Sequence, residues 1–298
     1  MKLFSKWYIA AVSLLLMSLA TPAPSGATVQ QRRPLYLPGG NSPYPGVDNH
    51  LFNCMPEPRN QEEKDLQTKV MHDVIACAGK YGPDNERLLE QARVDIMVFY
   101  NGRDALDTLG IKLGGAEVPA KPGETGRSWT SLEGQPSLNN PTTSIWVWSL
   151  DQWNSLNGTV PSSVNDEQVM GTTKYELGHQ FDVLWAKVQN PSWRSITQND
   201  LTWIKAINCD ARSIDIQTVE SARAKWPRLF LPGKYAASEI FTELTAMEVG
   251  GVDLEEDEWL KRNFSCASYY VHNLEQSHGT APVVSLPYNS GVCKCSQD

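Results

Sequence analysis

Histidine is scarce in this chain: only five of the 298 residues are His, which leaves little room for a histidine-rich metal site. No apolar run is long enough to cross a bilayer, and this excludes an ordinary membrane protein. Basic residues are also outnumbered, with 26 Lys and Arg against 34 Asp and Glu. The net charge of −8 argues against a protein that binds the phosphates of nucleic acids. The 41% hydrophobic residues are still enough to build a buried core.

The amino terminus has the features of an export signal. Lys2 and Lys6 form a short basic region, and a mostly apolar stretch follows that ends in small residues at Ala20. This stretch is too short to span a membrane, and small residues suit signal peptidase. We therefore expect a signal peptide over residues 1–20, with an alternative cut after residue 27. The protein is then secreted, into the extracellular space or the periplasm according to the host.

Proline divides the rest of the chain. Eight of the 19 prolines fall within residues 21–60, which we interpret as a Pro-rich lead-in, either a propeptide or a tether. Residues 61–298 then form the main domain.

The cysteines indicate disulfides. All six lie beyond the expected signal: Cys54, Cys77, Cys209, Cys266, Cys293 and Cys295. An even number in an exported chain is typical of a disulfide framework, although the sequence does not choose the connectivity. Cys293 and Cys295 are too close to pair with each other, so each is expected to tie the tail to the body. No CxxC pair is present, which disfavours a cysteine metal site.

Two segments match the acceptor motif for N-linked glycosylation. They are Asn157-Gly158-Thr159 and Asn263-Phe264-Ser265. Both have meaning only if the host is eukaryotic.

Hydrophobic periodicity predicts the main elements. Apolar residues at helical spacing predict a helix over 62–80 and a shorter one over 85–93. Runs of β-branched and aromatic residues predict strands over 94–100 and 144–148. The remainder, 166–276, is expected to be mainly helical.

The segment 172–182 carries the most informative pattern. Its apolar residues continue at helical spacing beyond the segment and form one face of a helix: Leu177, Phe181, Leu184 and Val188. The opposing stripe carries Tyr175, His179 and Asp182, with Glu176 beside them. A zinc peptidase needs two metal-binding side chains one helical turn apart, and a carboxylate that takes a proton from the metal-bound water. The motif H-E-x-x-H supplies this geometry, but here the first histidine is Tyr175.

Tyr175-Glu176-Leu177-Gly178-His179-Gln180-Phe181-Asp182 resembles the H-E-[LF]-G-H-x-x-D signature of zincin metallopeptidases. The similar group is the anthrax lethal factor-like one, which includes the Pro-Pro endopeptidases. That group takes its third zinc ligand from a later E-x-F-x-E segment preceded by a tyrosine. Glu239-Ile240-Phe241-Thr242-Glu243 matches this second motif, with Tyr235 just upstream.

The resemblance implies a fold and a set of roles. The fold is an α+β, zincin-like metallopeptidase fold, with a small mixed sheet, an active-site helix, a mainly helical C-terminal part and disulfide staples. The metal ligands would be Tyr175, His179 and Glu239. Glu176 would be the catalytic base and Tyr235 the donor to the oxyanion. Asp182 and Glu243 would orient neighbouring groups, and Asp182 has a second reading as a substitute ligand.

The residues around Glu239 agree with that assignment. Ile240, Leu244 and Met247 form an inward helical stripe, and Glu239 and Glu243 lie one turn apart beside it. A carboxylate beside a buried stripe is costly unless it is paired or binds a cation. The alternative is an ordinary solvated helix face with two acidic residues.

The tyrosine at position 175 leaves three hypotheses for the function of the chain. A phenol must ionise to bind zinc, which costs ~4 kcal/mol at pH 7 from its ordinary pKa. In the first hypothesis the chain is a pseudopeptidase in which zinc is lost or weakly held, and it acts by binding a peptide or protein. In the second it is an active metalloendopeptidase with an atypical Tyr175, His179 and Glu239 zinc site, and the strand over 144–148 offers its edge to an extended substrate. In the third the motif match is accidental.

Overall fold

The computed structural model describes most of the chain from residue 55 onward. The described residues are 35–36, 51–52, 55–92, 94–99, 127–131, 144–149, 166–231, 234–251, 253–283, 285–288 and 291–293. All of them belong to one compact unit, Arg32–Asp298. The expected signal peptide over 1–20 lies outside the described residues, as does most of the Pro-rich lead-in over 21–60.

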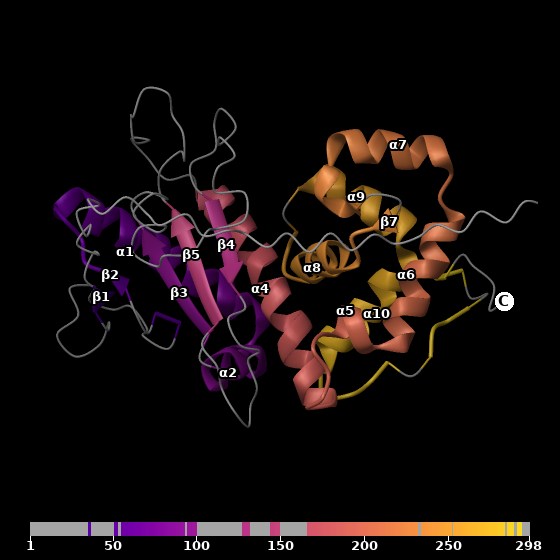
Figure 1. The fold of residues 1–298 in the computed structure, drawn as a ribbon, viewed down its shortest axis with the longest axis horizontal. Helices are drawn as coiled ribbons and strands as arrows, with labels where there is room; N and C mark the ends of the chain where they lie inside the picture. Colours follow the sequence, from indigo (N-terminus) through magenta and orange to yellow (C-terminus); the bar gives the residue numbers. More distant parts are fainter. Residues whose placement is uncertain are drawn as a thin grey trace, which may run out of the picture. The chain divides into compact units, whose positions relative to one another are not determined.

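Helices make up most of the described chain (Figure 1). The nine α-helices among the described residues are α1 (Gln61–Ala78), α2 (Pro83–Gln91), α4 (Asp166–Gln189), α5 (Ile196–Asn199), α6 (Leu201–Ser213), α7 (Ile216–Lys225), α8 (Ala237–Glu248), α9 (Leu254–Asn263) and α10 (Ser265–Gln276). Two short 3-10 turns accompany them, η1 (Gly79–Tyr81) and η2 (Pro227–Leu229).

Local signals explain where the longer helices begin and end. The Asn60 side chain accepts a hydrogen bond from the Glu63 backbone N–H and so caps the start of α1. The Asp200 carboxylate does the same for α6. Helix α4 ends at Gln189, just before Asn190 and Pro191, because the residue before a proline avoids the helical conformation. The helices predicted over 62–80 and 85–93 correspond to α1 and α2, each within two residues.

The strands are short. β3 (Val94–Phe99) pairs in parallel with β5 (Ser144–Ser149), and β4 (Arg127–Ser131) pairs antiparallel with the other side of β5. Two further pairs have two residues per strand: β1 (Leu35–Tyr36) with β2 (Met55–Pro56), and β6 (Phe230–Leu231) with β7 (Lys234–Tyr235). Because β5 lies in the centre of its sheet, the expectation that this strand offers an edge to a substrate is wrong.

The predicted fold class is also wrong. An α+β, zincin-like fold was expected from the motifs, but the described body is essentially helical, and its organisation rests on helix–helix packing. The buried residues come largely from α1, α4, α6, α8 and α10, and the large aromatic side chains of the core lie on helices. The prediction failed because the two motifs specify residues on α4 and α8 only, whereas the packing of the other helices determines the architecture.

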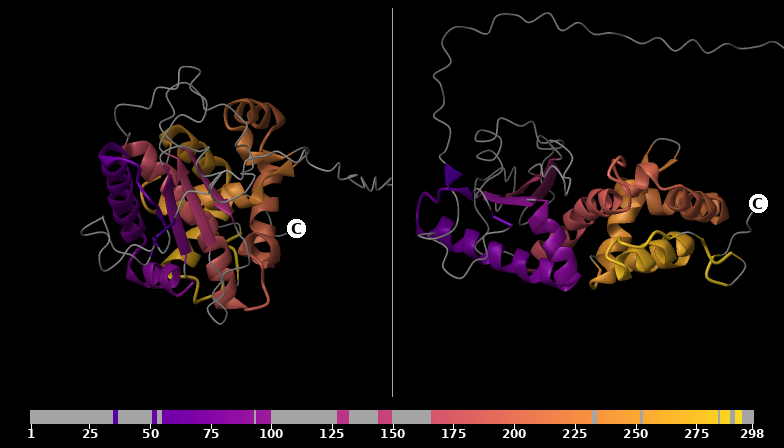
Figure 2. Two further views of the ribbon diagram at one scale, coloured as in Figure 1. Left: turned by 60° about the vertical axis from the view of Figure 1, so that its left-hand side comes forward. Right: turned by 90° about the horizontal axis from the view of Figure 1, so that it is seen from below.

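Helix α4 is the central element of this packing. It contacts α8, α1 and strand β4, and Figure 1 shows it passing between the three strands and the C-terminal helices. Figure 2 shows from two further sides that α1 lies along the strands. The core around α4 is aromatic: Trp185 stacks on Phe181 with ring centroids 5.0 Å apart, and Phe241 of α8 meets Trp203 of α6 edge-on at 5.2 Å.

The end of the expected lead-in is part of this core. Leu51 and Phe52 are fully buried, and the Leu51 carbonyl accepts a hydrogen bond from the Ile96 N–H of β3 at 2.7 Å. A segment that buries two large apolar side chains contributes to stability by the hydrophobic effect. At least this part of residues 21–60 therefore belongs to the folded unit.

No helix among the described residues is both long and apolar enough to cross a membrane.

Helices α4 and α8 approach each other closely at a glycine. A Cβ atom added to Gly178 would lie 2.9 Å from the Thr242 carbonyl oxygen and 3.0 Å from the Thr242 Cα. Both of these neighbours are backbone atoms, which cannot move without moving α8. The contact therefore requires glycine at this position of α4.

We expect Gly178→Ala to lower the free energy of unfolding by about 1–3 kcal/mol, because the added methyl group forces the two helices apart. Urea denaturation monitored by circular dichroism measures the change. Gly79→Ala is the matched control, since its Cβ would meet only the Glu86 side chain at 3.5 Å. If both substitutions had equal small effects, the close approach of α4 and α8 would be refuted.

Candidate functional site

Helices α4 and α8 bring three of the predicted metal-site residues together. The Tyr175 hydroxyl donates a hydrogen bond to Glu239 Oε2, and His179 Nε2 lies 3.9 Å from the same oxygen. The Tyr175 and His179 rings meet edge-to-face, with centroids 5.1 Å apart. Tyr175 and His179 of α4 therefore converge on one carboxylate oxygen of Glu239, which lies 64 positions after Tyr175 in the sequence.

His179 is neutral and held by α8. Burial lowers the pKa of His179 to about 4, so the imidazole carries no charge at neutral pH. Its Nδ1 lies 3.1 Å from the Thr242 hydroxyl, which leaves Nε2 facing Glu239. A threonine that fixes one ring nitrogen while the other faces the site is the kind of support that ligating histidines use.

Glu239 is hard to ionise in this environment. Burial, reinforced by the negative charge of Glu243 one turn away, raises the pKa of Glu239 to about 7. The hydrogen bond from Tyr175 satisfies one of its oxygens.

A single arginine connects two buried carboxylates to the tyrosine. Arg228 of η2 bonds Glu243 Oε1 through Nε at 3.1 Å, and Glu256 Oε2 of α9 through Nη2 at 2.6 Å. Both carboxylates are at most 1% exposed. The Arg228 guanidinium also lies over the Tyr175 ring, 5.5 Å from its centroid, in a cation–π contact. Glu243 therefore pairs with Arg228, which is not one of the predicted metal ligands.

Asp182 faces away from this cluster. Its carboxylate accepts hydrogen bonds from the Thr197 N–H at 2.9 Å and the Thr197 hydroxyl at 2.7 Å, and so ties α4 to the first turn of α5. Burial raises the pKa of Asp182 to about 6, although the bonds from Thr197 oppose the shift. With both oxygens used in this way, Asp182 is a structural tie, and its reading as a substitute metal ligand loses support.

The two predicted catalytic residues, Glu176 and Tyr235, lie on α4 and in β7. Glu176 is buried on α4, one residue after Tyr175. Tyr235 lies in β7, where its backbone pairs with Phe230, and its side chain lies outside the described residues.

Zinc does not fit this group as it stands. Two ligand atoms of a tetrahedral zinc ion lie about 3.4 Å apart, because zinc binds His nitrogen and carboxylate oxygen at about 2.0–2.2 Å. The 3.9 Å between His179 Nε2 and Glu239 Oε2 is longer than this separation. The third position is Tyr175, whose proton already bonds Glu239 directly. Only two ordinary zinc ligands are thus supplied here by the described residues.

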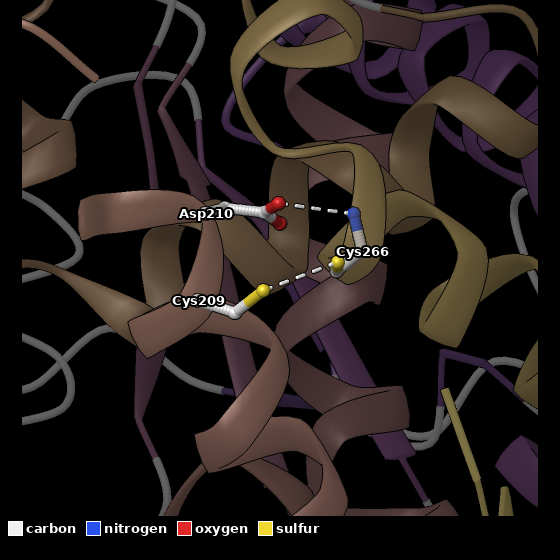
Figure 3. Close-up of side chains that lie close together, drawn as sticks. All are labelled: Cys209, Asp210 and Cys266. Atoms are coloured by element: carbon white, nitrogen blue, oxygen red, sulfur yellow. Dashed lines mark hydrogen bonds between the residues drawn. The ribbon is translucent and has the colours of Figure 1, made fainter. Parts of the chain in front are cut away.

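A second group of potential ligands lies elsewhere. Ligand atoms of Cys209, Asp210 and Cys266 lie within 4.8 Å of one another, at the contact of α6 with α10 (Figure 3). Cys266 forms a disulfide with Cys293, and Cys209 is also disulfide-bonded. Neither can supply the thiolate that metals bind. Asp210 accepts hydrogen bonds from the Cys266 and Ala267 N–H groups at 3.1 and 2.8 Å, and so caps α10. This group is therefore a structural tie between helices.

The disulfide pattern is known in part. The bond between Cys266 and Cys293 joins the tail to α10, as expected for Cys293. Cys77 is a buried thiol, so not every cysteine is paired. Cys54 and Cys295 lie outside the described residues.

The sequence did not point to Arg228 or Thr242. Thr242 lies inside the second motif, at a position that the motif leaves unspecified, and helical spacing from Glu239 was the one signal available for it. Arg228 lies in the interruption before α8, where nothing in the sequence marks it.

Comparison with known proteins finds no relative of this chain. No protein-family model matches the chain, and no curated protein or solved structure is significantly similar to it.

We expect the free energy of unfolding to fall as the pH rises from about 4.5 to about 8. Burial raises the pKa of Glu256 to about 8, with a further contribution from the charge of Glu243, and also raises those of Glu239 and Asp182 to about 7 and 6. The folded state therefore binds more protons than the unfolded state in this window, and it loses that advantage as each group ionises. Urea denaturation at a series of pH values measures the slope.

Glu256→Gln should make this slope shallower, because glutamine still accepts a bond from Arg228 but does not titrate. Glu258→Gln is the matched control, since Glu258 is exposed on the same helix. An identical slope for wild type and Glu256→Gln would contradict the shifted carboxyl.

The disulfide predicts a stability effect of its own. We expect the double substitution Cys266→Ala and Cys293→Ala to lower the free energy of unfolding by about 3–4 kcal/mol, because the bond closes a loop with a sequence separation of 27. Denaturation of the variant against wild type under non-reducing conditions measures it. A loss below about 1 kcal/mol would show that the tail is held by other contacts.

Proposed function

We propose that this chain is a secreted, metallopeptidase-like protein that binds a peptide or protein partner without hydrolysing it. The observation that carries the proposal is the hydrogen bond from the Tyr175 hydroxyl to Glu239 Oε2. This bond gives the partly buried Glu239 carboxylate a donor from within the protein, where a peptidase would use a cation. The group is then satisfied without a metal.

The energetics favour the metal-free state. For zinc to use Tyr175, the phenol must lose its proton, at a cost of ~4 kcal/mol at pH 7 before the attraction of the ion is counted. The ion must also replace the existing bond between Tyr175 and Glu239. Zinc bound by only His179 and Glu239 would lack the three protein ligands that catalytic sites use.

The partner would be an extended peptide or a protein segment. Strand β4 has a paired neighbour on one side only among the described strands, and it contacts α4. Such an edge offers backbone N–H and C=O groups to an added strand. The proposal therefore moves the expected binding edge from β5 to β4. Secretion is part of the proposal and rests on the export signal over residues 1–20.

We expect purified wild-type protein to contain little zinc, and Tyr175→His to gain close to one equivalent after incubation with zinc. The substitution supplies the missing imidazole and removes the donor to Glu239. Tyr175→Phe is the matched control: it also removes the hydroxyl but adds no ligand, so it should gain none. Elemental analysis of dialysed protein measures the metal content.

Hydrolysis distinguishes the remaining hypotheses. Peptide cleavage should be absent in wild type, and Glu176→Gln should leave peptide binding unchanged. Stoichiometric zinc in wild type that disappears in His179→Ala, together with cleavage that Glu176→Gln abolishes, would replace this proposal with the active metalloendopeptidase.

A further inference from the structure

An open groove of about 820 Å³ lies between helices α7 and α9. This volume lies within the range of ~300–1,000 Å³ typical of ligand sites. The groove is unrelated to Tyr175 and Glu239, and none of the site residues above lines it.

The lining suits an uncharged, polar ligand. Two acidic and two basic side chains contribute to it, namely Asp215, Glu255, Lys225 and Arg262, so their formal charges cancel. Lys225 and Glu255 already form an ion pair with each other. Hydroxyl and amide side chains of α7 complete the polar surface.

Two tryptophans also line the groove. Trp226 and Trp259 have ring centroids 5.7 Å apart, and each residue is 7% exposed. Aromatic surface beside polar groups suits a ligand that has both C–H faces and hydroxyls. A sugar has this combination.

One residue that lines the groove, Asn263, can accept a sugar. Asn263 is the last residue of α9, lines the groove, and begins the sequon Asn263-Phe264-Ser265. Its Nδ2 donates one hydrogen bond, to the Trp259 carbonyl at 2.8 Å. An amide has two N–H groups, so one is available for substitution while the other keeps this bond.

We propose that Asn263 is an N-glycosylation site and that the innermost sugar of its glycan lies in the groove between α7 and α9. In the transfer, Asn263 Nδ2 forms a bond to the anomeric carbon of a lipid-diphosphate-linked oligosaccharide. The bond from that carbon to the diphosphate oxygen breaks, the lipid diphosphate leaves with the electron pair, and the amide gives one proton to the transferase.

Transfer must precede folding. Phe264, the middle residue of the sequon, is fully buried in the folded chain, and Ser265 has become the first residue of α10. The acceptor is therefore accessible to a transferase only while the chain is extended. The inference depends on export through a eukaryotic secretory pathway and is independent of whether the protein binds zinc or peptides.

The first test is occupancy. The full chain is secreted from a eukaryotic cell line, and the peptide that contains Asn263 is examined by mass spectrometry before and after digestion with peptide N-glycosidase. We expect a glycan on Asn263 in wild type and in Ser265→Thr, which keeps the sequon, and none in Ser265→Ala. An unmodified Asn263 in the secreted wild-type protein would overturn the proposal.

The second test is the position of the sugar. We expect the glycosidase to release the glycan about tenfold more slowly from native than from unfolded protein, the factor that corresponds to ~1.4 kcal/mol of contact. Ser221→Leu, which fills part of the groove, should abolish most of this difference and leave occupancy unchanged. Glu220→Leu is the control, because Glu220 is exposed on α7 and does not line the groove. Equal release from native and unfolded wild type would overturn the placement in the groove.

Discussion

The close contact of α4 with α8 at Gly178 and Thr242 determines the geometry of the candidate site. Because glycine has no side chain, the two helices approach until the Thr242 backbone lies where a Cβ would be. At that separation the Thr242 hydroxyl reaches His179, and Glu239, one turn earlier on α8, reaches Tyr175, one turn earlier on α4. One glycine therefore supports two side-chain contacts that come from helices far apart in sequence.

The stability of this region depends on how its buried acids are held. Glu243 and Glu256 are both buried and share one cation, Arg228. Burial raises the pKa values of both acids, and nearby negative charges add to the shift, although the attraction of Arg228 opposes it. Arg228 also covers the Tyr175 ring. The same residue thus supports the acid pair and fixes the orientation of the tyrosine, so the site and the packing of α9 are linked.

Local patterns predicted much of the site and less of the fold. Helical spacing placed Tyr175 and His179 on one stripe of α4, and the second motif placed Glu239 on α8. The partner of Asp182 was missed because Thr197 lies on a separate short helix, and the pairing of two helices cannot be read from the spacing within one of them. The strand over 144–148 was located correctly, but its central place in the sheet depends on β3 and β4, which are distant in sequence. The fold class was wrong for a related reason: it came from the resemblance of two short motifs to a family, and these motifs do not specify how the other helices bury the core.

The choice of tyrosine at position 175 has a physical explanation within this network. Glu239 is largely buried and needs a hydrogen-bond donor once no metal is present, because an unsatisfied buried carboxyl costs about 1–3 kcal/mol or more. Alanine or phenylalanine at position 175 could neither bind zinc nor donate a hydrogen bond to Glu239. Tyrosine supplies one from the correct side of α4, and its ring offers Arg228 an aromatic face that an aliphatic side chain lacks. Among residues that abolish ordinary zinc ligation, tyrosine is therefore one that keeps α4, α8 and the arginine in place.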